Sequence, residues 1–251
     1  MTSLAERRLY VLRNWKAIEH EFSHSVLRRA PVEEKHPVRV LLTTPHEAID
    51  PAIANGLRDP YSGHIATLTQ RALTSAGVAA TVISPCLHRA RCDQNRIRGL
   101  VRGGDMVAEL HEYGCTNVPW LHIDVHSFFN DASPLPTGWG RGVNIITLCG
   151  DDAQARSARR MQKVLRDHVP SAPEARVVSM DRYPTTDTDD DSNAQTEWSR
   201  SRGMMSLLVE LPVRSKDHTQ CSDDSCWLCS YADAPAYANA LAAYCAATLS
   251  G

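Results

Sequence analysis

Short apolar runs alternate with longer amphipathic stretches through the first half of the chain. Residues 38–43 are almost continuously apolar, which is typical of a buried strand. Residues 61–76 carry apolar side chains at helical spacing, and Gly77 is placed to end that helix. Residues 78–84 form a second apolar run. The order strand, helix, strand favours an α/β fold with a mostly parallel sheet.

The same patterns continue to the C-terminus. Apolar runs predict further strands at 120–128, 143–148, 176–180 and 204–211. Helical spacing predicts helices at 104–113, 153–168 and 234–249. Pro212 is expected to end the last strand, because proline cannot donate to a ladder. The acidic, polar stretch 183–202 follows neither pattern, so we interpret it as a loop.

The N-terminal segment has a pattern of its own. Residues 3–29 place apolar side chains on one helical face, at Leu4, Val11, Trp15, Ile18, Phe22 and Val26. We therefore expect an N-terminal amphipathic helical extension over 1–36, followed by a single α/β domain over 37–251. The extension either packs on that domain or serves as a dimerisation or partner helix.

Composition narrows the class of protein. The chain has 251 residues, of which 43% are hydrophobic and 22% charged, with a formal net charge of −2. These values describe a globular protein without a general attraction to nucleic acid or to anionic membranes. No apolar run approaches the roughly 20 residues that cross a bilayer, and no signal peptide is evident, so we expect a cytoplasmic protein. The eight cysteines and eleven histidines then suggest metal binding or catalysis more than disulfides.

The strand at 120–128 is the most informative segment. Side chains alternate across a strand, so His122, Asp124 and His126 share one face. Ionisable groups on a buried face need partners, and a metal ion satisfies imidazole and carboxylate together. An exposed edge strand is the alternative, but the neighbouring Trp120 and Phe128 favour burial.

Other candidate residues follow or lie within predicted strands. His46 comes just after the first strand, where ligands gather in open parallel sheets, and acidic residues follow it at Glu47, Asp50 and Asp59. Asn95 and Arg96 could hold a substrate carboxylate, because guanidinium binds it in a bidentate manner, although a surface arginine is the simpler reading. Glu210 lies inside an apolar strand and suits a general base, or else a buried salt bridge.

Together these segments resemble the N-formylglutamate amidohydrolase family, which shares its fold with zinc carboxypeptidases and aspartoacylase-like deacylases. The matching pieces are His46, Asp-Gln-Asn-Arg at 93–96, Ile-Asp-Val-His-Ser at 123–127 and Leu-Val-Glu-Leu at 208–211, in the family's order. The resemblance implies a mostly parallel mixed sheet flanked by helices, of the zinc-carboxypeptidase-like (phosphorylase/hydrolase-like) class.

The resemblance also implies roles for individual residues. His46 and His126 would bind zinc. Ile49 stands where zinc carboxypeptidases have their glutamate, whereas the amidohydrolase family tends to place an aspartate just before the following helix. The third ligand would therefore be Asp59, which precedes the predicted helix 61–76, rather than Asp50 or Glu47. Substrate would be held by Asn95, Arg96 and Ser127. Asp124 would contact the metal ligands without binding the metal itself, and Glu210 would be the general base.

The expected function is therefore hydrolysis of a C–N amide bond in an N-acyl (N-formyl) amino acid or a similar small carboxylate-bearing substrate. Zinc would activate the water, Glu210 would take its proton, and Arg91 or Arg98 would stabilise the oxyanion. A carboxypeptidase-like metallopeptidase acting on short peptides is one alternative. A non-catalytic binding module that keeps the fold is another.

A separate cysteine-rich segment lies near the C-terminus. Its candidate ligands for a second, structural zinc ion are His218, Cys221, Cys226 and Cys229. Free thiols or one disulfide are the alternatives, because the spacing lacks the two separated pairs of a zinc finger.

Overall fold

The fold is an α/β arrangement around a mixed sheet. The computed structural model describes residues 28–29, 38–47, 59, 61–85, 89, 93, 95, 120–129, 140, 142–148, 150–169, 175–179, 194–213 and 234–250. Within them the sheet has the order β1-β3-β2-β4-β7-β5-β6. The strands are β1 (Arg28–Arg29), β2 (Val40–Thr43), β3 (Ala80–Ser84), β4 (Leu121–Phe129), β5 (Asn144–Thr147), β6 (Arg176–Ser179) and β7 (Met205–Val213). The helices are α2 (Ser62–Ser75), α5 (Asp152–His168), α6 (Ala194–Ser201) and α8 (Ala234–Ser250).

Strand directions confirm the mixed α/β sheet. β2 runs parallel to both β3 and β4, and β5 runs parallel to β6. β5 is antiparallel to β7, and the two-residue β1 is antiparallel to β3. The apolar runs predicted as strands are strands, and the helices predicted at 61–76, 153–168 and 234–249 are present as α2, α5 and α8.

The chain divides into two compact units. The first comprises Met1–Arg58, Ala79–Asp124 and Thr185–Ser206, and the second comprises Asp59–Val78, Val125–Pro184 and Leu207–Gly251. β4 and β7 each contribute residues to both units. The predicted boundary at residue 36 stays a prediction. Within the described ranges, no helix is both long enough and apolar enough to span a membrane.

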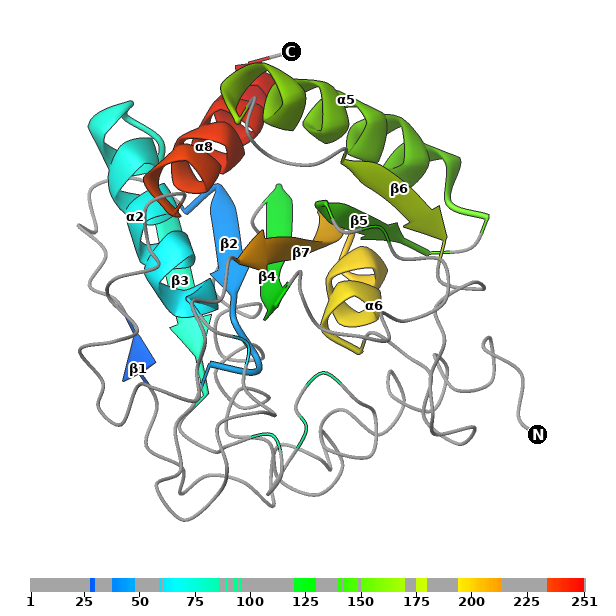
Figure 1. Cartoon of the computed structure of the whole chain (residues 1–251), viewed down its shortest axis with the longest axis horizontal. Helices are drawn as coiled ribbons and strands as arrows, with labels where there is room; N and C mark the ends of the chain where they lie inside the picture. The colour runs from blue at the N-terminus through cyan, green and yellow to red at the C-terminus, as the bar shows by residue number, and fades with distance from the viewer. Residues whose placement is uncertain are drawn as a thin grey trace. The chain divides into compact units, whose positions relative to one another are not determined.

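The first unit is built on β2. All four residues of β2 are buried, and the strand is paired on one side with residues 80–83 and on the other with residues 121–124. Figure 1 shows β2 beside β3 in this unit. Thr43 lies opposite Asp124 in this register, so their side chains share one face of the sheet.

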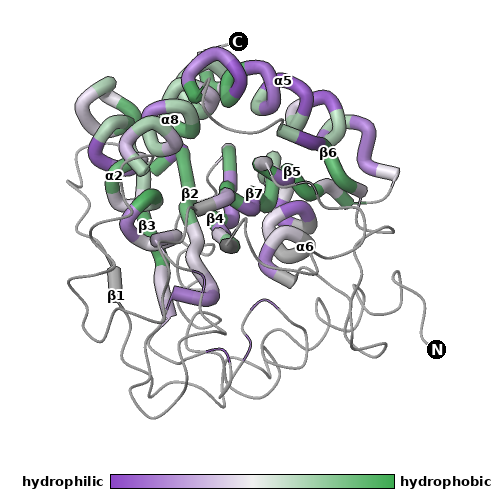
Figure 2. Tube along the Cα trace, in the orientation of Figure 1, coloured by the Kyte–Doolittle hydropathy of each residue, from purple (hydrophilic) through white to green (hydrophobic). Residues whose placement is uncertain are grey.

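The second unit holds three of the described helices. α8 packs against both α2 and α5 (Figure 1). α5 is capped by the side chain of Asp151, which accepts a hydrogen bond from the backbone N–H of Gln154 at 2.9 Å. Its buried residues recur at helical spacing, whereas much of its surface is hydrophilic (Figure 2).

The structure corrects three predictions. Residues 28–29 are strand β1 rather than the end of a helix, because their backbone pairs with Ile83 and Ser84; residues 3–27 lie outside the described part. Residues 194–201 form α6 and are not a loop. β7 continues through Pro212 to Val213, beyond its pairing with β5, which ends at Glu210. The missing N–H of Pro212 therefore costs that ladder no bond. The helix predicted at 104–113 lies outside the described residues.

Candidate metal centre

β4 is a buried strand with three ionisable side chains on one face. His122 and Asp124 are fully buried, and His126 is 1% exposed. β4 is therefore not an exposed edge strand, and the burial that the sequence pattern favoured is confirmed. Trp120, just before the strand, is instead 68% exposed. The Arg39 guanidinium lies over the Trp120 ring, 5.3 Å from the ring centroid.

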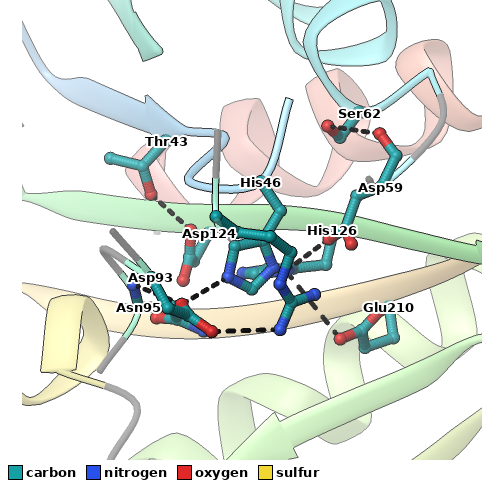
Figure 3. A network of polar contacts seen from close by, with 10 residues as sticks. Thr43, His46, Asp59, Ser62, Asp93, Asn95, Asp124, His126 and Glu210 are labelled. Carbon is teal, nitrogen blue, oxygen red and sulfur yellow. Dashed lines mark hydrogen bonds and ion pairs between the residues drawn. The ribbon is translucent and has the colours of Figure 1, made fainter. Parts of the chain in front are cut away.

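Asp59 and His126 meet in the second unit. Asp59 Oδ2 lies 2.6 Å from His126 Nδ1, and both side chains are buried (Figure 3). Glu210 Oε1 lies 3.9 Å from the same ring nitrogen. The backbone near Asp59 is held by Ser62, whose hydroxyl donates to the Asp59 carbonyl at 3.3 Å. Tyr61, between them, has a left-handed φ of 70°, which is rare for a bulky residue.

His46 is presented by a tight turn after β2. The backbone N–H of Glu47 donates to the Thr44 carbonyl, and Thr44 Oγ1 donates to Glu47 Oε2 at 3.1 Å. Ser84 Oγ lies 2.6 Å from the same hydroxyl and must donate to it, because the Thr44 hydrogen is already used. The Glu47 carboxylate therefore holds the turn, and it is not part of the metal-binding set given below.

Asp93 orients His46 in the first unit. Its Oδ1 lies 2.8 Å from His46 Nε2 and accepts the backbone N–H of Asn95 at 3.1 Å. Its Oδ2 accepts from Arg89 at 3.1 Å. Figure 3 shows Asp93 beside Asn95, with a dashed line from its carboxylate to His46.

His46, Asp59 and His126 are all buried, and each offers one ligand atom for a metal ion. Two imidazoles and one carboxylate form a donor set that zinc accepts at hydrolytic sites. The Asp93–His46 contact adds the outer carboxylate that commonly supports a metal-binding histidine. The residues present therefore fit a metal ion.

The remaining predicted site residues are placed as follows. Asn95 is 8% exposed and Ser127 is 3% exposed. Asp124 accepts a hydrogen bond from the Thr43 hydroxyl at 2.6 Å. Other predicted residues lie outside the described part of the chain, namely Asp50, Arg91, Arg96, Arg98, His218, Cys221, Cys226 and Cys229.

Sequence reasoning did not single out three residues that contact the site or the strands beside it. Asp93 stands inside the Asp-Gln-Asn-Arg segment, yet nothing local shows that it reaches His46, 47 residues away. Asn144 lies opposite Glu210 in the β5–β7 register and binds the preceding loop through the Gly140 N–H at 2.9 Å. Arg176, opposite Asn144 on β6, packs against Gly140 so closely that a Cβ there would lie 2.8 Å from its Nε.

Comparisons with solved structures find similar chains at low identity. The CwlD amidase from Clostridioides difficile, in complex with the GerS lipoprotein, is 13% identical with a TM-score of 0.49, over 84% of this chain and 98% of that chain. An N-acetylmuramoyl-L-alanine amidase from Clostridium difficile 630 is 10% identical with a TM-score of 0.44, over 86% and 99%. A metallo-carboxypeptidase from Burkholderia cenocepacia is 11% identical with a TM-score of 0.45, over 96% and 69%. No protein-family model and no curated protein matches the sequence.

Proposed function

We propose that this chain is a metal-dependent hydrolase of a C–N amide bond in an N-acyl (N-formyl) amino acid or a similar small carboxylate-bearing substrate. The observation that carries the proposal is the buried pair of Asp59 and His126, 2.6 Å apart, with the Glu210 carboxylate 3.9 Å from the same ring nitrogen; His46, also buried, is proposed as the further ligand. Buried ionisable side chains in such a cluster are costly unless they serve a common partner. A zinc ion held by them would supply Lewis acidity and a water molecule whose pKa is lowered to about 7.

Glu210 is proposed as the general base. Its side chain is buried within β7, and its carboxylate lies 3.9 Å from His126 Nδ1, beside the proposed metal ligands. A carboxylate in this position accepts a proton from the attacking water and delivers it to the leaving nitrogen. The products are a carboxylic acid and an amine.

Asn95 and Arg96 are proposed to bind the substrate carboxylate. Asn95 is buried, and its backbone N–H is bonded to Asp93, the residue that also contacts His46. This contact supports a position for Asn95 close to His46. Arg96 follows directly in the chain and supplies the positive charge that a carboxylate requires. Ser127, next to His126 and also buried, is proposed as a further substrate contact.

Metal analysis combined with a substrate panel tests the proposal. Purified protein should hold about one zinc ion per chain, and His46→Ala/His126→Ala should lose it while remaining folded by circular dichroism. The panel contains N-formyl, N-acetyl and N-succinyl amino acids beside short peptides with a free C-terminus. Preferential hydrolysis of the peptides would replace the proposed substrate with that of a carboxypeptidase-like enzyme. Zinc binding without hydrolysis of any member would favour a binding module, and absence of zinc would overturn the proposal.

A further inference from the structure

A continuous chain of buried hydrogen bonds lies apart from the proposed metal ligands. Ser206 Oγ is 2.7 Å from His122 Nδ1, and His122 Nε2 is 2.7 Å from Thr43 Oγ1. Thr43 Oγ1 in turn donates to Asp124 Oδ1 at 2.6 Å. All four side chains are fully buried, and they come from β2, β4 and β7 within one compact unit.

The direction of the chain fixes the tautomer of His122. The hydroxyl of Thr43 has one hydrogen, and that hydrogen goes to the Asp124 carboxylate, which can only accept when ionised. The Thr43 oxygen must therefore accept the second contact, so His122 donates to it through Nε2–H. This assignment holds whichever way the hydrogen runs between His122 Nδ1 and Ser206.

β4 and β7 also carry groups of the proposed active site, and the turn that follows β2 carries a third. Thr43 precedes His46 by three positions, His122 precedes His126 by four, and Ser206 precedes Glu210 by four. At about 3.3 Å per residue, His122 on β4 and Ser206 on β7 lie roughly 13 Å upstream of His126 and Glu210 along their own strands. The contacts thus join the same three strands that present the two histidines and the base.

We propose that His122 is a positioning residue. Held as the Nε2–H tautomer between Ser206 and Thr43, it fixes β2, β4 and β7 relative to one another and so sets the spacing of the groups further along those strands. This inference rests on the proposed metal-dependent function. Apolar side chains could fill the same space, but they would allow several packings, whereas a fully satisfied polar chain specifies one.

Two substitutions of Thr43 separate positioning from simple stability. Thr43→Val keeps the shape of the side chain but removes the hydroxyl, whereas Thr43→Ser restores a hydroxyl in a smaller side chain. Thr81→Val is the matched control, because Thr81 is equally buried on the neighbouring β3 and its hydroxyl has no hydrogen-bond partner among the described residues. Ser206→Ala is the milder variant should Thr43→Val fail to fold.

The first measurement is the imidazole ¹H–¹⁵N spectrum of the metal-free protein. We expect His122 to carry its proton on Nε2 in the wild type and in Thr43→Ser, and the signals of His46 and His126 to shift in Thr43→Val but not in Thr81→Val. The second is zinc affinity by competition with a chromophoric chelator. Thr43→Val should bind zinc about 10-fold more weakly, at the lower end of the range for outer-shell changes. Ser206→Ala should bind it several-fold more weakly, and Thr43→Ser and Thr81→Val should stay within about three-fold.

The outcomes decide the inference separately from the proposed function. A proton on Nδ1 alone, or unchanged zinc affinity in folded Thr43→Val or Ser206→Ala, overturns the positioning role. If wild-type protein binds no zinc, the proposed function fails and the spectra alone decide. If the His46 and His126 signals then shift in Thr43→Val but not in Thr81→Val, the inference that His122 positions the two histidines is kept. If they do not shift in Thr43→Val, that inference is overturned.

Discussion

His46 Nε2 lies 2.8 Å from Oδ1 of Asp93, a carboxylate that is also held by the Asn95 backbone and by Arg89. Two other groups fix the Asp93 carboxylate, and the carboxylate in turn fixes the imidazole ring of His46. The histidine is therefore oriented before any ligand arrives.

Removing the Asp93 carboxylate should weaken metal binding without removing a ligand. We expect Asp93→Ala to lower zinc affinity by about 10- to 100-fold, the range for outer carboxylates behind a metal-binding histidine. Arg89→Met is the control, because the partly exposed Arg89–Asp93 ion pair contributes only about 0–1 kcal/mol. A chelator competition titration measures both. Equal losses in the two variants would mean that Asp93 does not act through His46.

The acidic ligand can be identified by comparing two carboxylates. Asp59→Asn should lower zinc affinity by more than about 100-fold, beyond the range for outer-shell changes, because it removes a proposed ligand. Glu47→Gln should stay within about three-fold, because its carboxylate holds the turn through Thr44. The same titration decides, and a larger loss in Glu47→Gln would make Glu47 the ligand.

The proposed base can be tested without disturbing the metal. Glu210→Gln keeps the size of the side chain but removes its capacity to accept a proton. Hydrolysis should fall by about 10²- to 10⁴-fold, the usual contribution of general base catalysis, while zinc content stays at the wild-type level. Steady-state rates on the best substrate and elemental analysis of the same sample provide the two readouts. Unchanged turnover in a zinc-loaded variant would assign the base elsewhere.

A buried phenol links stability to alkaline pH. Tyr244 and Ser157 share a 2.6 Å hydrogen bond between α8 and α5, and burial raises the pKa of Tyr244 to about 12 against the opposing effect of that bond. Tyr244→Phe should cost about 1 kcal/mol at pH 8. Between pH 10 and 12 the unfolded chain loses this proton first, so the wild type loses about 1.4 kcal/mol per pH unit through Tyr244. Urea unfolding at pH 8 and pH 11 measures the difference in unfolding free energy between wild type and Tyr244→Phe. That difference should vanish or reverse at pH 11, and an equal difference at both pH values would contradict this.

The close contact of Gly140 with Arg176 predicts a coupled pair. A Cβ at position 140 would lie 2.8 Å from Arg176 Nε and 3.0 Å from its Cδ. Gly140→Ala should therefore destabilise the protein by about 1 kcal/mol, the lower end for overpacking, because an exposed arginine can partly move away. In an Arg176→Ala background the same substitution should cost less, by at least about 0.5 kcal/mol. A thermal or urea double-mutant cycle measures the coupling, and strict additivity would contradict it.

Local patterns were sufficient for the regular elements with apolar signals. The alternation in β4 predicted that His122, Asp124 and His126 share a face, and the buried runs gave β2, β3 and β5. α6 was missed because its buried residues are polar, namely Gln195, Thr196 and Ser199, so no apolar periodicity marks it. Trp120 was expected in the core but is exposed, because it lies just before β4. The guanidinium of Arg39 lies over its ring.

The site could be predicted only as far as chain order allows. The order of the resembling motifs nominates His46 and His126 as ligands, and Asp59 is nominated by its place just before the helix α2. The contacts that orient these groups join residues distant in sequence: Asp93 with His46 across 47 positions, and Ser206 with His122 across 84. No local periodicity encodes such pairs, because each depends on how strands from different parts of the chain are ordered in the sheet.

The hydrogen-bond chain from Ser206 to Asp124 has a consequence for how this sequence can diverge. Replacing one member alone leaves a buried donor or acceptor without its partner, which costs more than exchanging the whole chain for apolar side chains. Positions 43, 122, 124 and 206 should therefore evolve as a group: relatives either keep a hydroxyl, an imidazole, a carboxylate and a hydroxyl there, or carry hydrocarbon at all four. Sequences that keep only one polar residue of the group would be less stable than either alternative.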